Sequence, residues 1–408
     1  MKKKLLGLLL AVSMVVSLTA CSGGSDTASD TSTTDTTETT ETTDTAESDS
    51  AETADDAAAS SDVLKIGVAA ATTGSDPLEG ERMVQALELA VQEYTDNGGT
   101  IQVELDIQDS QGTTDGALNA VQRLISDGCQ VIIGPHKSTQ VLAVGETVDA
   151  AGVPFVSGGT SPNLVGQFDT LFTCRTNDEL TAVIGAQACI DELGAQKVGI
   201  FYGSDDYGSG GFTVASQYFE ENGIEYVSEV YNSGDTDVSG QVLSLMNQDL
   251  DCILVWAHGA DMPLIFRTMN QLGSEVPVVA ASGIAIGQYL DLMEAEWVDG
   301  YYGIGEWIAN RDSEVVQHFG PAFEEATGEP AEMFSATYYG AFLAVMDAVE
   351  KGGGTDSASI MEGLKQVSGL SVPLGTYTCD ENQQLLHEAV LVQMDGKDPV
   401  EIRTITAE

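Results

Sequence analysis

Short apolar runs alternate with longer segments whose apolar residues recur at helical spacing, from residue 63 to about residue 282. The run at residues 63–71 is typical of a buried strand, and Met83, Leu87 and Ala90 follow it along one face of a predicted helix. The same succession recurs along the chain. It predicts eight strands, at residues 63–71, 101–107, 131–134, 153–157, 197–203, 224–230, 252–257 and 276–282.

The eight predicted strands fall into two groups of four, separated near residue 175. Strands that alternate with helices form parallel sheets covered on both faces, and a closed barrel requires more even spacing. We therefore predict two doubly wound parallel-sheet α/β lobes. Two long helical patterns, at residues 312–326 and 333–350, depart from the alternation, as do the later strands. This region is expected to cover the lobes or to cross between them.

The first residues predict export and lipid attachment. Lys2, Lys3 and Lys4 precede an apolar run that is too short to span a bilayer, so residues 1–20 are typical of a signal peptide. The sequence "LTAC" that ends at Cys21 resembles a bacterial lipobox, which implies cleavage before Cys21 and a lipid on its thiol. The alternative is an ordinary cleavage site followed by an unrelated cysteine.

Residues 22–62 consist almost entirely of Thr, Ser, Ala, Asp and Glu, with no Lys, Arg or aromatic residue. Such a segment buries too little apolar surface to offset the entropy lost on folding, and its like charges repel one another. We predict that residues 21–62 carry the lipidated cysteine and form a disordered spacer, and that the fold begins near Val63.

The formal charge of the chain is −49 at pH 7, and residues 63–408 contribute −40 of it. Such a field repels nucleic acid and anionic lipid surfaces. We therefore expect no nucleic-acid partner, and contact with the membrane only through the lipid anchor.

Cysteine and histidine usage argues against a metal site. Five cysteines follow Cys21, an odd number, and no two have a CxxC spacing. The four histidines are not close to one another in the sequence. We expect no metal and no cofactor, and mostly buried thiols, with one disulfide as the alternative. The pairing cannot be read from the positions Cys129, Cys174, Cys189, Cys252 and Cys379.

Small polar residues gather where the predicted strands end. Ligands of doubly wound sheets bind beyond the carboxyl ends of the strands. His258 follows such an end and either lines a cleft or is an ordinary loop histidine. The six loops at these ends are residues 72–78, 135–139, 158–162, 203–208, 257–261 (which includes His258) and 282–284.

Nucleotide-binding and catalytic motifs are absent from the sequence. Lys137, Ser138 and Thr139 lack the glycine spacing of a phosphate-binding loop, and "YGSDDYGSG" lacks that of a dinucleotide loop. The chain also contains no G-x-S-x-G and no H-E-x-x-H. We therefore predict a binding protein rather than an enzyme.

Six segments together resemble a known family in their order and spacing: "IIGPHKSTQ", "VPFVSGGTSPNL", "LFTCRTNDEL", "VGIFYGSDDYGSG", "GYYGIGEW" and "GTYTCDENQQ". The family is that of the branched-chain amino-acid-type (type I) extracytoplasmic solute-binding proteins of ABC importers. The resemblance implies two lobes that are joined by three crossovers and close on a ligand. It places residues 63–178 and 306–370 in lobe 1, and residues 179–305 and 371–408 in lobe 2.

The resemblance also implies roles for individual residues. Ser138, with Thr139 beside it, would hold the α-carboxylate of the ligand, and Gly158 and Thr160 would bind carboxylate and amine. Tyr207 would close over the ligand from lobe 2. The alternatives are a helix N-cap for Ser138 or Thr139, a cap or turn for Thr160, and core packing for Tyr207.

The sequence departs from the family pattern at two positions. Ser282 stands where an acidic residue usually pairs with the ligand's ammonium group, and Leu78 stands where many members have an aromatic residue. If no other acid replaces it, the ligand has no ammonium group. The candidates for the replacement are Glu79, Asp205, Asp206 and Asp261.

Three residues near the predicted crossovers have structural roles in this scheme. Asp178 would anchor the first crossover, and Glu306 and Trp307 would form a wall or a hinge.

We thus expect a monomeric extracytoplasmic receptor, anchored to the cell membrane by lipid. It would bind a small polar organic solute, an amino acid or a related carboxylate, and deliver it to the permease and ATPase subunits of an ABC importer. The alternatives are a ligand sensor that feeds a signalling receptor and, less favoured, a secreted hydrolase.

Overall fold

The computed structural model describes residues 63–309 and 311–405. The predicted signal peptide, Cys21 and the spacer therefore lie outside the described residues. In the described part of the chain, none of the helices combines the length and the apolar character that a membrane span requires.

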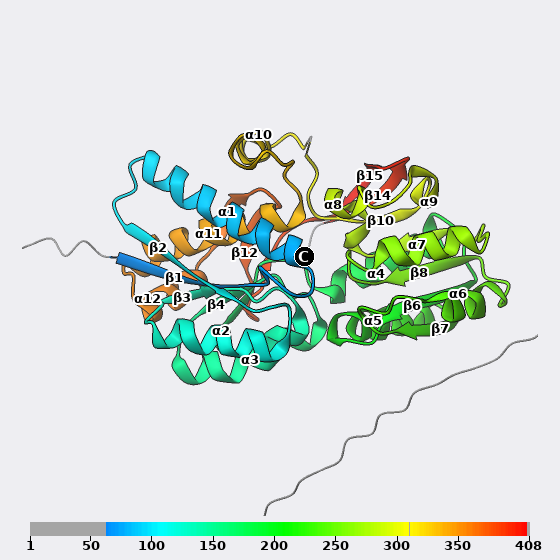
Figure 1. Cartoon of the computed structure of the whole chain (residues 1–408), viewed down its shortest axis with the longest axis horizontal. Helices are drawn as coiled ribbons and strands as arrows, with labels where there is room; N and C mark the ends of the chain where they lie inside the picture. The colour runs from blue at the N-terminus through cyan, green and yellow to red at the C-terminus, as the bar shows by residue number, and fades with distance from the viewer. Residues whose placement is uncertain (1–62, 310, 406–408) are drawn as a thin grey trace, which may run out of the picture. The chain divides into compact units, whose positions relative to one another are not determined.

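Lobe 1 is built on a five-stranded parallel sheet in the order β2-β1-β3-β4-β5 (Figure 1). Its inner strands are largely apolar because helices cover both faces of the sheet. The strands are β1 (Val63–Ala70), β2 (Gln102–Asp109), β3 (Val131–Ile133), β4 (Phe155–Ser157) and β5 (Leu171–Thr173).

Six helices belong to lobe 1. On one face of the sheet, Ile66 of β1 shares an apolar core with Leu87 of α1. On the other face, Ile132 of β3 shares a core with Leu124 of α2 and Val144 of α3. The helices are α1 (Pro77–Asp96), α2 (Thr114–Ser126), α3 (Ser138–Ala151), α10 (Glu314–Thr327), α11 (Met333–Gly352) and α12 (Ser357–Leu364).

Lobe 2 is built on a seven-stranded sheet in the order β15-β14-β10-β9-β8-β6-β7. Strands β6 to β10 are parallel to their neighbours in that set, whereas β14 is antiparallel to both β10 and β15. The strands are β6 (Lys197–Gly203), β7 (Glu225–Tyr231), β8 (Cys252–Trp256), β9 (Val278–Ala280), β10 (Tyr302–Gly305), β14 (Ala389–Asp395) and β15 (Asp398–Ile405).

Four longer helices and two single-turn helices complete lobe 2, and Figure 1 shows α4, α5, α6 and α7 around its sheet. They are α4 (Asp178–Asp191), α5 (Asp206–Glu221), α6 (Ser239–Met246), α7 (Met262–Gln271), α8 (Gly287–Leu290) and α9 (Ala295–Val298). Two α/β lobes with largely parallel sheets confirm the predicted fold class.

The chain crosses between the lobes three times: after β5, after β10 and after the last strand of a small third sheet. That sheet contains β11 (Ser368–Val372), β12 (Gly375–Cys379) and β13 (Leu385–Leu386). It lies against lobe 1, because Gln384 pairs with Thr173, the last residue of β5, and the hydroxyl of Tyr377 donates to the Cys174 carbonyl over 2.7 Å. The predicted boundary at residue 370 differs from the structure here, since residues 371–386 pack on lobe 1 rather than lobe 2.

The five cysteines of the described residues are all free thiols, and four of them are buried. No group of three or more His, Cys, Asp or Glu side chains that could hold a metal ion occurs within residues 63–309 and 311–405.

Helices α11 and α12 pack so closely that Gly363 is required. A Cβ atom at position 363 would overlap the carbonyl group of Ala348. We expect Gly363→Ala to lower the free energy of unfolding by about 1–3 kcal/mol, since the helices must move apart. Chemical unfolding measures this change. The control is Gly240→Ala in α6, where a Cβ meets no atom within 4 Å and should stabilise by up to about 1 kcal/mol. Equal stability of both variants would contradict the prediction.

Candidate ligand-binding site

A small cavity lies at the carboxyl ends of the strands, between residues of both lobes. Its volume is about 40 Å³. The structure brings six of the predicted ligand residues to its wall: Ser138, Gly158, Thr160, Tyr207, His258 and Ser282.

Two predicted ligand residues do not line this cavity. Thr139 lies in a neighbouring groove, where its hydroxyl accepts a hydrogen bond from the Asp206 N–H over 3.4 Å. Leu78 is 36% exposed, whereas the next residue, Glu79, lines the cavity. The reason is helical geometry. Helix α1 begins at Pro77, and successive residues of a helix point about 100° apart, so Glu79 faces inward and Leu78 does not.

Ser138 connects two loops of lobe 1. Helix α3 begins at Ser138 after the N-cap Lys137, so neither Ser138 nor Thr139 is the N-cap. The hydroxyl oxygen of Ser138 instead accepts hydrogen bonds from the N–H groups of Thr160 and Ser161 over 3.2 and 3.1 Å. A hydroxyl has one donor and two acceptor positions, so its O–H remains available to a ligand oxygen.

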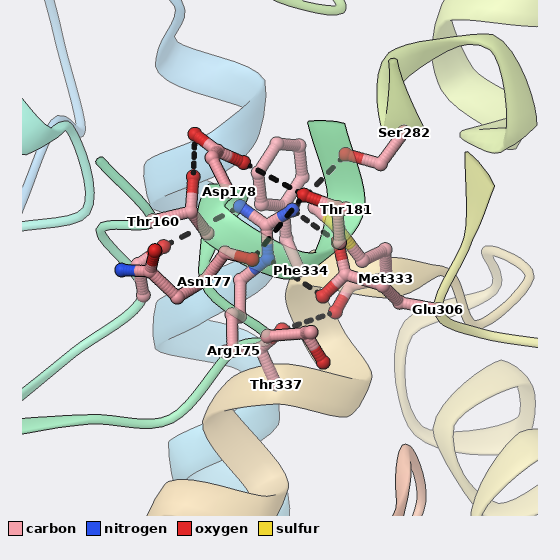
Figure 2. Close-up of polar contacts among 12 residues, drawn as sticks. Thr160, Arg175, Asn177, Asp178, Thr181, Ser282, Glu306, Met333, Phe334 and Thr337 are labelled. Carbon is pink, nitrogen blue, oxygen red and sulfur yellow. Dashed lines mark hydrogen bonds and ion pairs between the residues drawn. The ribbon is translucent and has the colours of Figure 1, made fainter. Parts of the chain in front are cut away.

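Thr160 is held by Asp178, the first residue of α4. The hydroxyl of Thr160 donates to the Asp178 carboxylate over 3.0 Å, and the Asp178 N–H donates to the Thr160 carbonyl over 2.8 Å. Thr181 donates to the other carboxylate oxygen (Figure 2). Burial raises the pKa of Asp178 to about 8, although these hydrogen bonds oppose the shift.

Arg175 is a cavity residue that sequence reasoning missed, although it stands in the quoted segment "LFTCRTNDEL". Figure 2 shows its guanidinium between Glu306 and Ser282. It donates two hydrogen bonds to the Glu306 carboxylate and a third, over 3.1 Å, to the Ser282 hydroxyl. Burial alone would lower the pKa of Arg175, but the Glu306 carboxylate raises the pKa by more than burial lowers it, so the side chain stays charged.

All three crossovers meet at Glu306, which follows β10. Arg175 belongs to the first crossover, and His387 of the third places Nε2 3.9 Å from the Glu306 carboxylate. Burial lowers the pKa of His387, so this ring is neutral at pH 7. These contacts place Glu306 where the three crossovers between the lobes meet. Trp307 packs instead on Phe319 of α10, with ring centroids 5.6 Å apart.

The wall from lobe 2 is formed by Tyr207 and His258, whose ring centroids lie 4.8 Å apart. His258 pairs with the Asp205 carboxylate. Burial alone would raise the pKa of Asp205, but the hydrogen bond with His258 lowers it. Among the described residues, the Tyr207 hydroxyl has no hydrogen-bond partner, so it is free to contact a ligand.

The acids near the cavity differ in whether their carboxyl groups already have a hydrogen-bond or ion-pair partner. Asp205 pairs with His258, Asp261 accepts from Tyr231 and Ser233, and Asp206 does not line the cavity. Of the four candidate replacements for the missing acid, only Glu79 lines it. Burial raises the pKa of Glu79 to about 8.

Hydrogen bonds across the cavity hold the lobes together. The Tyr289 hydroxyl of α8 contacts both carboxylate oxygens of Asp76, over 2.9 and 2.8 Å. The Ser161 hydroxyl donates to the Asp206 carbonyl over 3.0 Å. With a cavity this small, these contacts define a closed form of the two lobes.

Two α/β lobes that close on a polar cavity define the class of solute-binding proteins. The chain belongs to the periplasmic binding protein family, whose model matches residues 63–399. The resemblance to branched-chain amino-acid-type receptors is thereby confirmed, and both family and fold are those of extracytoplasmic solute-binding proteins rather than enzymes.

Related sequences and structures agree with this assignment. The chain is 22% identical over 339 residues to the Leu/Ile/Val-binding protein BraC3 of Rhizobium johnstonii, covering 80% of this chain and 90% of that protein. It is 26% identical over 344 residues to Leu/Ile/Val-binding protein homolog 8 of Brucella abortus, covering 78% and 83%.

Solved structures show the same fold. The leucine-binding protein LivK of Thermotoga maritima superposes with a TM-score of 0.78 at 24% identity, covering 84% of this chain and 99% of that chain. A solute-binding protein of Rhodopseudomonas palustris in complex with 3,4-dihydroxybenzoic acid superposes with a TM-score of 0.77 at 18% identity, covering 85% and 98%.

The raised pKa of Asp178 predicts a stability change with pH. Between about pH 4 and 8 the folded protein keeps a proton on Asp178 that the unfolded chain releases, so the free energy of unfolding falls as the pH rises. We expect Asp178→Asn to reduce this fall by up to about 1.4 kcal/mol per pH unit. Chemical unfolding at pH 5, 7 and 9 measures the slope.

The matched control for this experiment is Glu179→Gln, which changes an exposed acid one residue further along α4. It should leave the slope of the unfolding free energy against pH unchanged. The same slope for Asp178→Asn and the unmodified protein would show that Asp178 is ionised in the folded state.

Proposed function

We propose that the protein is a monomeric, lipid-anchored extracytoplasmic receptor that binds a small polar organic solute, an amino acid or a related carboxylate. It delivers the bound solute to the permease and ATPase subunits of an ABC importer. Membership of the periplasmic binding protein family supports the receptor and importer roles. The lipobox-like sequence at Cys21 supports the anchor.

The observation that carries the proposal is the set of unused hydrogen-bonding groups in the closed cavity. The hydroxyls of Ser138 and Tyr207 and the carboxyl group of Glu79 come from the first turns of three helices, α3, α5 and α1, and line one small space. Groups that converge in this way satisfy a small polar molecule when closure expels water. They hold the molecule without a nucleophile and base arranged for reaction.

The donors of lobe 1 favour a carboxylate at one end of the ligand. The Ser138 hydroxyl is oriented by the two N–H groups it accepts from, and the positively charged Arg175 and Lys137 also line the cavity. Hydrogen bonds from neutral hydroxyls and nearby positive charge suit an anionic oxygen pair. The ligand named for the Rhodopseudomonas palustris structure, 3,4-dihydroxybenzoic acid, carries a carboxylate.

A thermal-shift screen of amino acids and organic acids tests the proposal directly. A ligand at a hundredfold excess over its Kd stabilises the folded protein by about 2.7 kcal/mol, so the melting temperature should rise. Ser138→Ala should weaken the carboxylate ligand found by about 1–3 kcal/mol, measured by calorimetric titration. Binding by Ser138→Ala at the affinity of the unmodified protein would refute the role of this hydroxyl.

The contact between Tyr289 and Asp76 joins the lobes directly, so it should favour the ligand-bound form. We expect Tyr289→Phe to lower ligand affinity by about 0.5–1.5 kcal/mol, because the variant loses a hydrogen bond made in the closed form. Calorimetric titration measures this, with Tyr218→Phe in α5, a tyrosine that does not line the cavity, as the control. An unchanged affinity of Tyr289→Phe would mean that the contact is also made without ligand.

A further inference from the structure

Glu79 is the one acid of the cavity wall that has no partner in the described part of the chain. It is 5% exposed, and no hydrogen bond or ion pair joins its carboxyl group to any residue of 63–309 or 311–405. The neighbouring acid Asp76 is bonded by Tyr289, and the charge of Arg175 is balanced by Glu306. The unpaired carboxyl group of Glu79 therefore faces the space that the ligand enters.

We propose that Glu79 supplies the counter-charge for a positively charged amine of the ligand. This inference rests on the proposed function, and it identifies the ligand class as amine-bearing carboxylates such as amino acids. The counter-charge then comes from the first turn of α1 in lobe 1 rather than from the segment of Ser282 in lobe 2.

The surroundings of Ser282 exclude an amine at that position. Its hydroxyl accepts a hydrogen bond from the Arg175 guanidinium over 3.1 Å. An ammonium group placed against Ser282 would meet this fixed positive charge without a free carboxylate to balance it, because Glu306 already pairs with Arg175. The amine must therefore bind at another wall of the cavity.

The backbone around Glu79 is fixed, as a binding residue requires. Pro77 begins α1, and Asp76 before it adopts a left-handed conformation with φ of 61°. Gly80 packs against the backbone of Ala71 at the end of β1, where a Cβ atom would overlap the Ala71 carbonyl. These contacts set the first turn of the helix against the sheet and direct Glu79 into the cavity.

Glu79 can stay buried without a partner because its carboxyl group keeps its proton. The groups that act on it, or that it acts on, are Asp76, Lys137, Arg175, Tyr289, Glu332 and Tyr338. Burial raises the pKa of Glu79 to about 8, so this carboxyl group is protonated and neutral at pH 7. An amine that binds beside it favours the ionised form. Binding should then release about one proton at pH 7.

The competing interpretation is that protonated Glu79 donates a hydrogen bond to a ligand without an amine. The two interpretations predict opposite results for Glu79→Gln, because the amide keeps a donor but cannot carry a negative charge. They also differ in proton release, which only the amine requires.

The experiment uses equilibrium dialysis of the purified full chain against the protein amino acids, each matched with its 2-hydroxy acid, and detection by mass spectrometry. We expect the unmodified protein to retain one or more amino acids and not the matched hydroxy acids. Glu79→Gln should lose about 10- to 100-fold in affinity for the retained amino acid. The control Glu81→Gln removes an exposed acid from the same helix and should bind as the unmodified protein does.

Proton release provides a readout that does not depend on the folding of a variant. Calorimetric titration of the unmodified protein with the retained amino acid, in two buffers of different ionisation enthalpy, should give about one proton released at pH 7. The affinity should rise with pH up to about pH 8.

Three other outcomes overturn the inference, and they differ in what they leave standing. Retention of hydroxy acids alone, or unchanged amino-acid affinity of a folded Glu79→Gln, refutes the role of Glu79 and leaves the receptor function intact. Amino-acid binding without proton release refutes it as well. Retention of no compound counts against the proposed function itself, and the inference falls with it.

Discussion

The ion pair between Arg175 and Glu306 is the contact on which the arrangement of the two lobes depends. Both side chains are buried, so each charge has left water and is balanced by the other. Removing one partner of such a pair typically costs about 3–5 kcal/mol, because the other charge remains buried and unpaired. The pair ties the first crossover to the second, and His387 brings the third to the same carboxylate.

This network also determines which cavity groups remain for a ligand. Arg175 uses its donors on Glu306 and Ser282, Thr160 donates to Asp178, and His258 pairs with Asp205. These groups keep the loops in place. The hydroxyls of Ser138 and Tyr207 and the carboxyl group of Glu79 retain hydrogen-bonding capacity for a ligand.

The fold could be predicted from the sequence because the apolar pattern is strong where sheets are covered on both faces. The run at residues 63–71 became β1, and the long helical pattern at 333–350 became α11. Strand β5 was not predicted because its residues, Leu-Phe-Thr, include no Val or Ile, whereas β3 and β4 do. Residues 371–386 were assigned to lobe 2 because no local pattern indicates that Tyr377 contacts Cys174. At the site, the order and spacing of the segments shared with the family indicated Ser138 and Tyr207. The start of α1 had to be known before Glu79 could be identified as the cavity residue in place of Leu78. Arg175 could be identified only from the structure, because its partner Glu306 lies 131 residues away in the sequence.

Arg175 is both a wall of the cavity and part of the joint between the lobes, and this limits how ligand specificity can change during evolution. A substitution there alters recognition and lobe movement together, so few replacements are tolerated. Glu79 and Tyr207 make no contact with the ion pair through hydrogen bonds. Related receptors could therefore acquire new ligands through exchanges at such positions while the mechanics of closure are inherited unchanged.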